Sequence, residues 1–241
     1  MSNVTAFTVL EKTFGPWSIS VRCQPLSPRE VETRYDRAAA RWDRVMTRFC
    51  AASAYRALLE SALDDSPPMI GAGFRALDCG TGTGALTEAL YAAAPNRFQT
   101  DAVDLSPEML ARANGNFRAR GIPATVRQAS VCALPYPDDQ FDLTMAAHVC
   151  EHLADPNEAL AEMIRVTRPG GRVVVIMSRQ TLAARFLQAR WRMHLMTPKQ
   201  AALMMEDAGL AGVRRLSPGQ ATRFDHFSLA HVATVKSRGR P

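Results

Sequence analysis

A short glycine-rich stretch, running from Asp78 to Gly84 (DCGTGTG), constrains the fold more than any other part of the chain. An apolar run precedes it and a helix-like pattern begins at residue 85, so the stretch predicts a strand, a tight turn and a helix. Gly80, Gly82 and Gly84 permit positive φ and allow a ligand to approach the backbone. The N–H groups and the positive dipole end of the following helix point toward the same space. The stretch therefore predicts a site for a polar, often anionic, ligand.

Length and composition indicate one large globular domain. The chain has 241 residues, of which 47% are hydrophobic and 22% charged. The absence of a long apolar run predicts no transmembrane segment, and the N-terminus without a basic region predicts no signal peptide. Five scattered cysteines without a CxxC motif predict reduced thiols in a cytosolic protein. The net charge of +6 comes from arginines spread along the chain, which favours solvated basic faces over a dedicated nucleic-acid surface.

The order of hydrophobic patterns predicts an α/β fold. Residues 1–27 are expected to form an N-terminal extension, residues 28–68 a helical cap or lid, and residues 236–241 a frayed tail. The main domain, 69–235, alternates the two patterns. Strands are expected at 74–78, 99–103, 124–128, 141–146, 172–177, 211–216 and 227–235, and helices at 84–94, 107–120, 155–167, 181–195 and 197–208. Such alternation is typical of a doubly wound, mostly parallel sheet.

Asp104 is the second candidate residue for binding a ligand. It ends the strand that follows the glycine-rich turn, where a carboxylate can accept hydrogen bonds from both hydroxyls of a ribose. The alternative is an N-cap for the helix that begins at Pro107, although Ser106 suits that position well. Because the glycine spacing differs from GxGxxG, the pair of motifs favours S-adenosylmethionine (SAM) over a dinucleotide.

These motifs resemble those of class I SAM-dependent methyltransferases. The resemblance rests on the glycine-rich stretch, Asp104, residues 133–142 (ALPYPDDQFD), the EHL at 151–153 and the RPGG at 168–171. It implies a Rossmann-like, seven-stranded sheet of order 3-2-1-4-5-7-6 with an antiparallel last strand. It also implies that the glycine turn wraps the methionine part of SAM, and that Asp78 orients the loop or the SAM amino group.

The same resemblance assigns Leu105, Ser130 and Val131 to the adenosine end of the cofactor. Ser130 departs from the family, which often has an acid at this position to hold the adenine amino group. A hydroxyl accepts a hydrogen bond without the charge-assisted strength of a carboxylate. The backbone of Val131 remains available to the ring.

The region from Glu32 to Arg44 resembles the lid of ubiquinone/menaquinone C-methyltransferases and phospholipid N-methyltransferases. This resemblance implies that Tyr35 faces the sulfonium and helps to exclude water from the reaction. The alternative is that Tyr35 and Trp42 simply form the apolar stripe of a helix packed on the domain.

His148, Glu151 and His152 follow the fourth predicted strand, where this fold places residues that face the substrate. We expect His148 to act as a general base. The cluster can alternatively hold a divalent ion such as Mn²⁺ or Mg²⁺, or merely form local hydrogen bonds. Its HxxEH spacing also matches an inverted zinc-peptidase motif, which would require a helix that begins at His148.

Residues 181–196 predict a basic amphipathic helix, with apolar positions at 182, 183, 186, 187, 191 and 195 and with arginines at 179, 185, 190 and 192 around them. Such a helix suits either a lid over the substrate or peripheral contact with an anionic membrane.

The sequence as a whole predicts a SAM-dependent enzyme that methylates a small apolar or lipid-like acceptor, and the resemblance favours a quinone. One alternative is the reaction of rhodoquinone biosynthesis relatives, in which SAM supplies an amino group to ubiquinone with help from a divalent metal. Another is a non-catalytic SAM-binding accessory protein. A nucleic-acid substrate is disfavoured, because 146–149 (AAHV) lacks the (D/N)PP(Y/F) signature. The expected location is cytoplasmic, with peripheral contact at the inner face of the membrane; the oligomeric state stays open.

Overall fold

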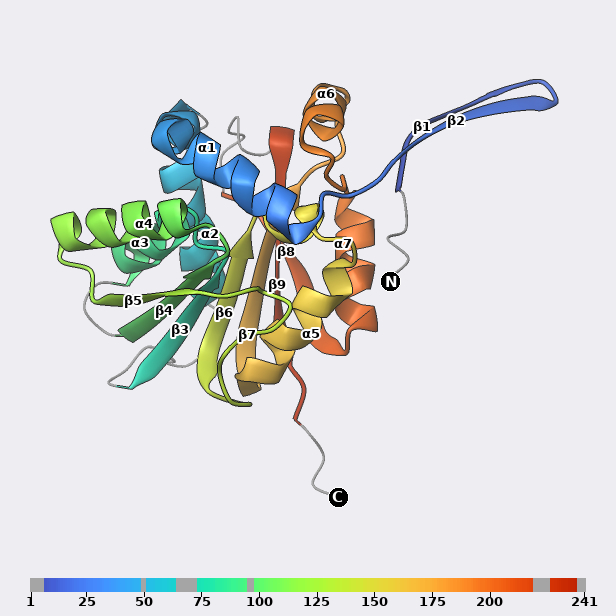
Figure 1. Ribbon diagram of the computed structural model, residues 1–241. Helices are drawn as coiled ribbons and strands as arrows, with labels where there is room; N and C mark the ends of the chain where they lie inside the picture. Colours follow the sequence, from blue (N-terminus) through green and yellow to red (C-terminus); the bar gives the residue numbers. More distant parts are fainter. Residues whose placement is uncertain (1–6, 49–50, 64–72, 95–97, 219–225, 238–241) are drawn as a thin grey trace.

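The computed structural model describes residues 7–48, 51–63, 73–94, 98–218 and 226–237, which form a central sheet flanked by helices (Figure 1). The seven strands are β3 (Phe74–Cys79), β4 (Phe98–Asp104), β5 (Ala124–Gln128), β6 (Phe141–Ala147), β7 (Thr167–Ser178), β8 (Leu210–Leu216) and β9 (Ser228–Val235).

The strand order is β5-β4-β3-β6-β7-β9-β8, which confirms the order implied by the resemblance. All pairs from β5 to β7 are parallel, whereas β9 runs antiparallel to both β7 and β8. One expected boundary was wrong: β7 begins at Thr167 rather than at 172, because Thr167 already pairs with Phe141 across a bulge. The glycine turn after β3 therefore lies at the centre of the sheet, beside the place where the strand order reverses, as in other doubly wound folds.

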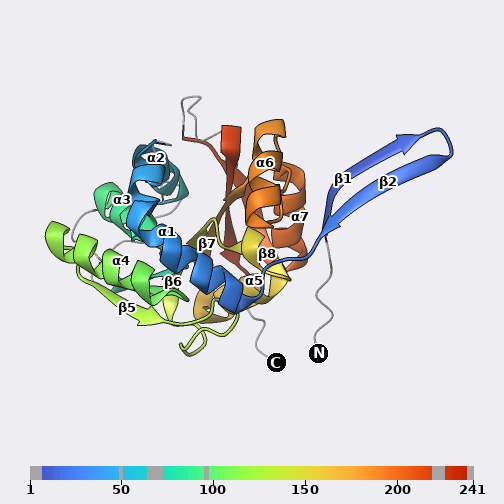
Figure 2. The ribbon, with the colours of Figure 1, turned by 45° about the horizontal axis from the view of Figure 1, so that its top comes forward.

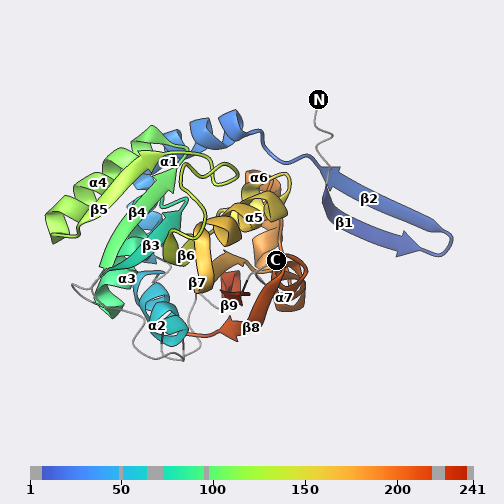
Figure 3. The same ribbon diagram turned by 90° about the horizontal axis from the view of Figure 1, so that it is seen from below.

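Helices cover both faces of the sheet (Figure 3). On one face lie α2 (Ala51–Leu63), α3 (Ala85–Ala93) and α4 (Pro107–Arg120), and on the other lie α5 (Pro156–Val166) and α7 (Pro198–Asp207). A hydrophobic core lies on each face of the sheet, and successive residues of the central strands point into one core and then the other. Ala76 packs with α2 and α3, and Leu77 packs with α5 and α7. Burial on both faces explains why these strands are continuous apolar runs.

Three helices begin with the same local signal, a side-chain cap followed by proline. Ser106 accepts a hydrogen bond from the Met109 amide, and Asp155 and Thr197 cap α5 and α7 in the same way. Proline at the first helical position costs no hydrogen bond and has a suitable φ. These signals explain why the starts of the helices were predictable to within a residue or two.

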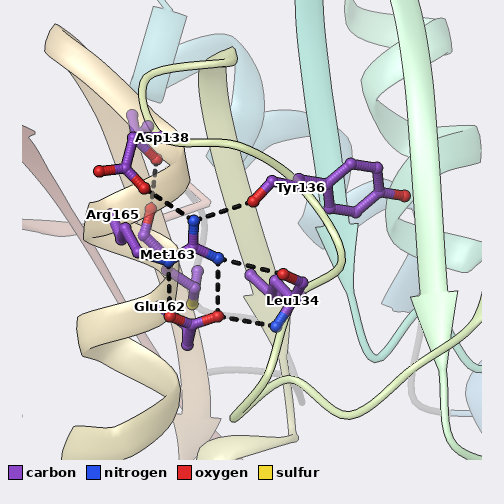
Figure 4. A network of polar contacts seen from close by, with 7 residues as sticks. Leu134, Tyr136, Asp138, Glu162, Met163 and Arg165 are labelled. Atoms are coloured by element: carbon purple, nitrogen blue, oxygen red, sulfur yellow. Dashed lines mark hydrogen bonds and ion pairs between the residues drawn. The ribbon is translucent and has the colours of Figure 1, made fainter.

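An arginine-centred network fastens the loop before β6 to α5 (Figure 4). Arg165 binds both carboxylate oxygens of Glu162 (2.6 and 2.8 Å) and donates to the backbone oxygens of Leu134 and Tyr136. Glu162 in turn accepts from the Leu134 amide (2.7 Å). Because bidentate charge-assisted bonds are directional, the network holds in place the loop that also carries Val131.

The N-terminal extension contains a hairpin that the sequence pattern did not predict. Strands β1 (Phe7–Phe14) and β2 (Trp17–Cys23) pair antiparallel around Gly15 and Pro16, and the hairpin projects away from the body of the molecule (Figures 1 and 2). The alternation of apolar and polar residues in β2 is the signal that was available for this prediction.

Two helices, α1 (Pro28–Arg48) and α6 (Leu182–Trp191), lie beyond the end of the sheet at which the glycine turn is located (Figure 2). No helix in the described ranges is long and apolar enough to cross a membrane. Of the expected tail, residues 238–241 lie outside the described residues.

Candidate active site

The glycine turn has the geometry of a ligand cradle. The amides of Gly80 and Thr81 donate to the backbone oxygen of Val103 (2.8 and 2.9 Å), and all three glycines of the turn have positive φ, between 56° and 94°. A Cβ at Gly80 would overlap the Val149 side chain, and one at Gly84 would lie 2.5 Å from the Phe117 ring. At Gly82 the nearest neighbour of a Cβ would be Trp42 Nε1, at 3.9 Å, so only this glycine faces open space.

Asp78 is fully buried below the turn. Its Oδ2 accepts hydrogen bonds from the hydroxyls of Thr81 (2.8 Å) and Thr87 (2.7 Å), while its Oδ1 has no hydrogen-bond partner among the described residues. Burial raises the pKa of Asp78 to about 6, although the two threonine hydroxyls oppose this shift. Because Asp78 does not line either cavity described below, its geometry fits the orientation of the loop rather than contact with the SAM amino group.

Asp104 faces the glycine turn and is not the helix cap. Its two oxygens accept from the amides of Gly82 (2.8 Å) and Ser106 (2.9 Å), and Ser106 provides the cap of α4. Burial raises the pKa of Asp104, although its hydrogen bonds to amides act in the opposite direction.

A small cavity of about 100 Å³ lies against the turn. Its lining includes Gly80 to Thr83, Asp104, Leu105 and Val131, as expected for the cofactor site. Ser130 does not line it; instead its Oγ accepts from the Cys132 amide (3.2 Å) and shapes the turn. The residue types that line this cavity suit SAM, because they provide a glycine-rich turn and a carboxylate at the position expected for the ribose. The volume of the small cavity alone is below the roughly 300 Å³ typical of ligand sites, so we expect α1 to shift when SAM binds.

α1 closes this cavity through aromatic contacts. The Tyr35 hydroxyl and His152 Nε2 are hydrogen-bonded at 2.8 Å, and the Tyr35 ring lies 5.3 Å from Trp42 and 5.5 Å from Trp191 of α6, between ring centroids. We call Tyr35, Trp42, His152 and Trp191 the aromatic cluster. On the other side of α1, Asp36 accepts a hydrogen bond from the Ser106 hydroxyl. Tyr35 therefore packs against other aromatic side chains and also lines the small cavity, while its role toward the sulfonium stays a prediction.

A second, larger cavity of about 930 Å³ lies between α1, α6 and the start of β9. It shares Tyr35, Trp42, Tyr55, His148 and His152 with the small cavity. The two cavities therefore meet at the aromatic cluster and His148, an arrangement that suits transfer between a cofactor and an acceptor.

His148 is held by a buried carboxylate. His148 Nδ1 lies 2.9 Å from Glu151 Oε1, which also accepts from the Ser178 amide and hydroxyl. Although burial raises it, the pKa of Glu151 is lowered overall by the hydrogen bond and charge of His148. Since a carboxylate only accepts, Nδ1 is the donor in this contact, and Nε2 lies 3.3 Å from the Ser228 hydroxyl. His148 has a φ of 58°, an uncommon conformation that occurs often at functional sites.

The three candidate metal ligands do not converge. His152 faces Tyr35, and burial lowers the pKa of His152 to about 4, which keeps it neutral. No group of three or more His, Cys, Asp or Glu side chains arranged for a metal ion occurs within the described ranges. The segment after His148 is a short 3-10 helix at Cys150–His152, so the helix required by a peptidase motif does not begin at His148.

The structure divides residues 181–196 between two environments. Trp191 belongs to the aromatic cluster, and Ala184 and Met193 line the large cavity, as expected for a lid. Leu182 is 87% exposed, whereas positions 183, 186 and 187 of the expected stripe have side chains outside the described set. Sequence reasoning missed Ser178 and Ser228, because no local pattern indicates that β7 and β9 bring them to His148.

Residues 77–175 match the family of methyltransferase domains. Over 105 residues the chain is 41% identical to a ubiquinone/menaquinone biosynthesis C-methyltransferase of Bdellovibrio bacteriovorus, which covers 44% of each chain. Over 121 residues it is 39% identical to a demethylmenaquinone methyltransferase of Thermus thermophilus, covering 50% of this chain and 52% of that relative. The matched region thus spans about half the length of these relatives.

Solved structures show the same fold at low identity. Phosphoethanolamine N-methyltransferase 2 of Haemonchus contortus, solved with SAM, superimposes with a TM-score of 0.66 at 16% identity, covering 91% of this chain and 63% of that one. Geranyl diphosphate C-methyltransferase of Streptomyces coelicolor gives a TM-score of 0.59 at 16% identity, covering 73% and 78%. The family match, the relatives and the fold together show that the chain is similar to class I SAM-dependent methyltransferases and, over residues 77–175, has a methyltransferase domain that resembles the ubiquinone/menaquinone C-methyltransferase branch.

Proposed function

We propose that the chain is a SAM-dependent methyltransferase whose acceptor is a quinone or a similar lipid-like molecule. The observation that carries the proposal is the junction of the two cavities at His148 and the aromatic cluster. The small cavity has the residues expected for SAM, and the large one has an aromatic wall and enough room for a ring with an apolar substituent. The two relatives described above, a ubiquinone/menaquinone biosynthesis C-methyltransferase and a demethylmenaquinone methyltransferase, support this acceptor class.

When bound, SAM supplies an electrophilic methyl group. The contribution of the chain is then mainly alignment and exclusion of water. Asp104 and the glycine turn would hold the cofactor, while Tyr35 and Trp42 would cover the reacting atoms. His148 Nε2 would take a proton from the acceptor, and Glu151 would position His148 and stabilise its charged form.

The acceptor identity, the cytoplasmic location and the metal remain predictions. Amino transfer from SAM to ubiquinone is the second candidate, and the observation in its favour is Ser130, which does not line the cofactor cavity as the family's acid would. Looser binding of adenine would suit a repurposed site.

Product analysis of the purified protein with SAM and a quinone extract tests the proposal. We expect a quinone that has gained one methyl group, and a His148→Ala variant that turns over about 10²–10⁴-fold more slowly. A product that gains one nitrogen and no methyl, formed only with Mn²⁺ or a similar ion, would establish the second candidate. SAM binding without turnover on a broad quinone panel would instead favour the accessory protein, and no SAM binding would overturn all three.

A further inference from the structure

The projecting hairpin has one apolar face that no other part of the described chain covers. Phe14 and Trp17 lie opposite each other at its tip, and Lys12 lies opposite Ile19, so these four residues share a face with Val21. The apolar side chains are 48–76% exposed, with Trp17 the most exposed. The acidic residue of the hairpin, Glu11, pairs with Ser20 and lies on the opposite face. The apolar face therefore carries a cation and no anion.

The mouth of the large cavity is basic. Five arginines line this cavity, namely Arg29, Arg34, Arg37, Arg41 and Arg190, and the acidic residues among its lining are Glu30 and Glu151. Glu30 binds Ser27 and Arg192, and Glu151 binds His148. Within the described part of the chain, no ion pair joins a carboxylate to the exposed Arg37 or Arg41. Positive charge at the mouth is thus left uncompensated.

The hairpin lies toward the end of the molecule that carries α1 and α6 (Figure 1), and residues of these two helices line the large cavity. Arg192 fixes this relation by donating to the backbone oxygens of Gln24 (2.7 Å) and Pro25 (3.2 Å), at the base of the hairpin. Leu182, 87% exposed at the start of α6, adds an apolar side chain to this end.

We propose that the hairpin face (Lys12, Phe14, Trp17, Ile19, Val21) and the arginines at the cavity mouth form a docking surface for an anionic lipid membrane. Tryptophan and phenylalanine at the end of a ribbon suit the boundary between head groups and acyl chains. Arginines attract the anionic head groups beside them. Docking would place the mouth of the large cavity at the bilayer, where a lipid-soluble acceptor is stored. This role of docking in supplying the acceptor rests on the proposed function.

A second copy of the chain is the other occupant that an exposed hairpin can have. Charge argues against it, because a symmetric pair that buried this surface would bring two sets of arginines together. An anionic surface matches both the apolar face and the arginines.

Vesicle co-sedimentation of the full chain tests the proposal. We expect binding to vesicles of phosphatidylcholine mixed with phosphatidylglycerol, little binding to phosphatidylcholine alone, and weaker binding as salt is raised. Phe14→Ser/Trp17→Ser and Arg37→Gln/Arg41→Gln should each lose at least about tenfold in vesicle affinity. Trp17→Phe keeps an aromatic ring and should bind. Arg118→Gln/Arg215→Gln removes the same charge from exposed positions outside the cavity lining, and should bind like the parent protein.

Circular dichroism and SAM calorimetry show whether each variant is folded. Equal vesicle binding by all variants, or none by the parent protein, would overturn the docking surface. The proposal would also be overturned if the parent protein bound no vesicles and light scattering showed that Phe14→Ser/Trp17→Ser converts a dimer to a monomer. The outcome is separable from the proposed function, because vesicle binding needs no turnover. If Phe14→Ser/Trp17→Ser turns over a detergent-solubilised quinone at the parent rate, the substitutions affect membrane docking and leave catalysis unchanged, which supports the proposal.

Discussion

At the scale of single residues, Asp78 shapes the cofactor loop from below. It has one oxygen bound by two threonine hydroxyls and one without a partner among the described residues, and it is fully buried. Ionising such a group costs free energy, which is why its pKa is raised to about 6.

We expect Asp78 to make the stability of the cofactor-free protein depend on pH. Its folded pKa of about 6 lies above the ordinary 3.8, so the folded state keeps a proton that the unfolded chain loses. The contribution of Asp78 to the free energy of unfolding is therefore greatest below pH about 4. It falls as the pH rises to about 6 and is lost above that pH. The total loss is up to about 3 kcal/mol. Urea unfolding of the parent protein and Asp78→Asn between these pH values measures the difference. A constant difference across the interval would contradict the raised pKa. SAM should bind more tightly as pH rises through it.

Two glycines of the same turn should respond differently to substitution. Gly82→Arg has room for its Cβ and projects into the cofactor cavity, so we expect loss of SAM binding with a modest drop in melting temperature. Gly84→Ala places a Cβ 2.5 Å from the buried Phe117 ring, at a φ of 94°, and should destabilise the fold by about 2–4 kcal/mol.

Calorimetry with SAM and thermal unfolding distinguish the two effects. Gly115→Ala is the matched control, because its Cβ would meet nothing within 4 Å inside α4. Normal SAM binding by Gly82→Arg would show that the cofactor lies elsewhere.

At the scale of elements, α1 lies against both cavities, as expected for a lid. It is held by the Asp36–Ser106 hydrogen bond on one side and by the aromatic cluster on the other. With α1 in this position, the cofactor cavity holds only about 100 Å³. We therefore expect α1 to move when SAM enters, and such movements commonly limit turnover.

SAM binding should change the environment of Trp42, whose Nε1 would lie 3.9 Å from a Cβ at Gly82. We expect a change in tryptophan fluorescence on adding SAM, largely lost in Trp42→Phe and retained in the control Trp17→Phe. Stopped-flow mixing should show a phase whose rate levels off with SAM concentration, since α1 opens first. Retention of the full signal in Trp42→Phe would place the moving contact elsewhere.

At the scale of the whole molecule, the predicted cap divides into two parts. α1 lies over the cavities, whereas α2 buries Ala54, Tyr55, Leu58, Leu59 and Ala62 in the same core as β3, β6 and α3. The boundary at 68/69 stays a prediction, but this packing couples α2 to the sheet.

Unfolding should accordingly be a single transition that includes α2. Leu58 is fully buried, so Leu58→Ala should lower the free energy of unfolding of the whole protein by about 2–5 kcal/mol. The control Leu203→Ala, at a residue 45% exposed on α7, should cost far less. Urea unfolding followed by circular dichroism and fluorescence measures both. An early, separate transition in Leu58→Ala alone would show that α2 is an independent unit.

Local sequence signals were sufficient to predict the strands of the central sheet and the starts of its helices. Alternating apolar runs, cap–proline starts and the glycine turn predicted every strand of the sheet, because both faces of a parallel strand are buried and helix ends are satisfied locally. The strand order came from the resemblance, and the structure confirms it. The β1–β2 hairpin was missed because its apolar face is exposed, so no core pattern surrounds it.

The sequence by itself determined the cofactor loop and its carboxylate, since Asp78 to Gly84 and Asp104 lie close to one another through two adjacent strands. Only the tertiary structure decided what surrounds His148. Glu151 is near it in sequence, but Ser178 and Ser228 arrive from β7 and β9. It also separated His152 from the supposed metal ligands by pairing it with Tyr35, 117 residues earlier. Such contacts depend on how layers pack, and no local spacing encodes them.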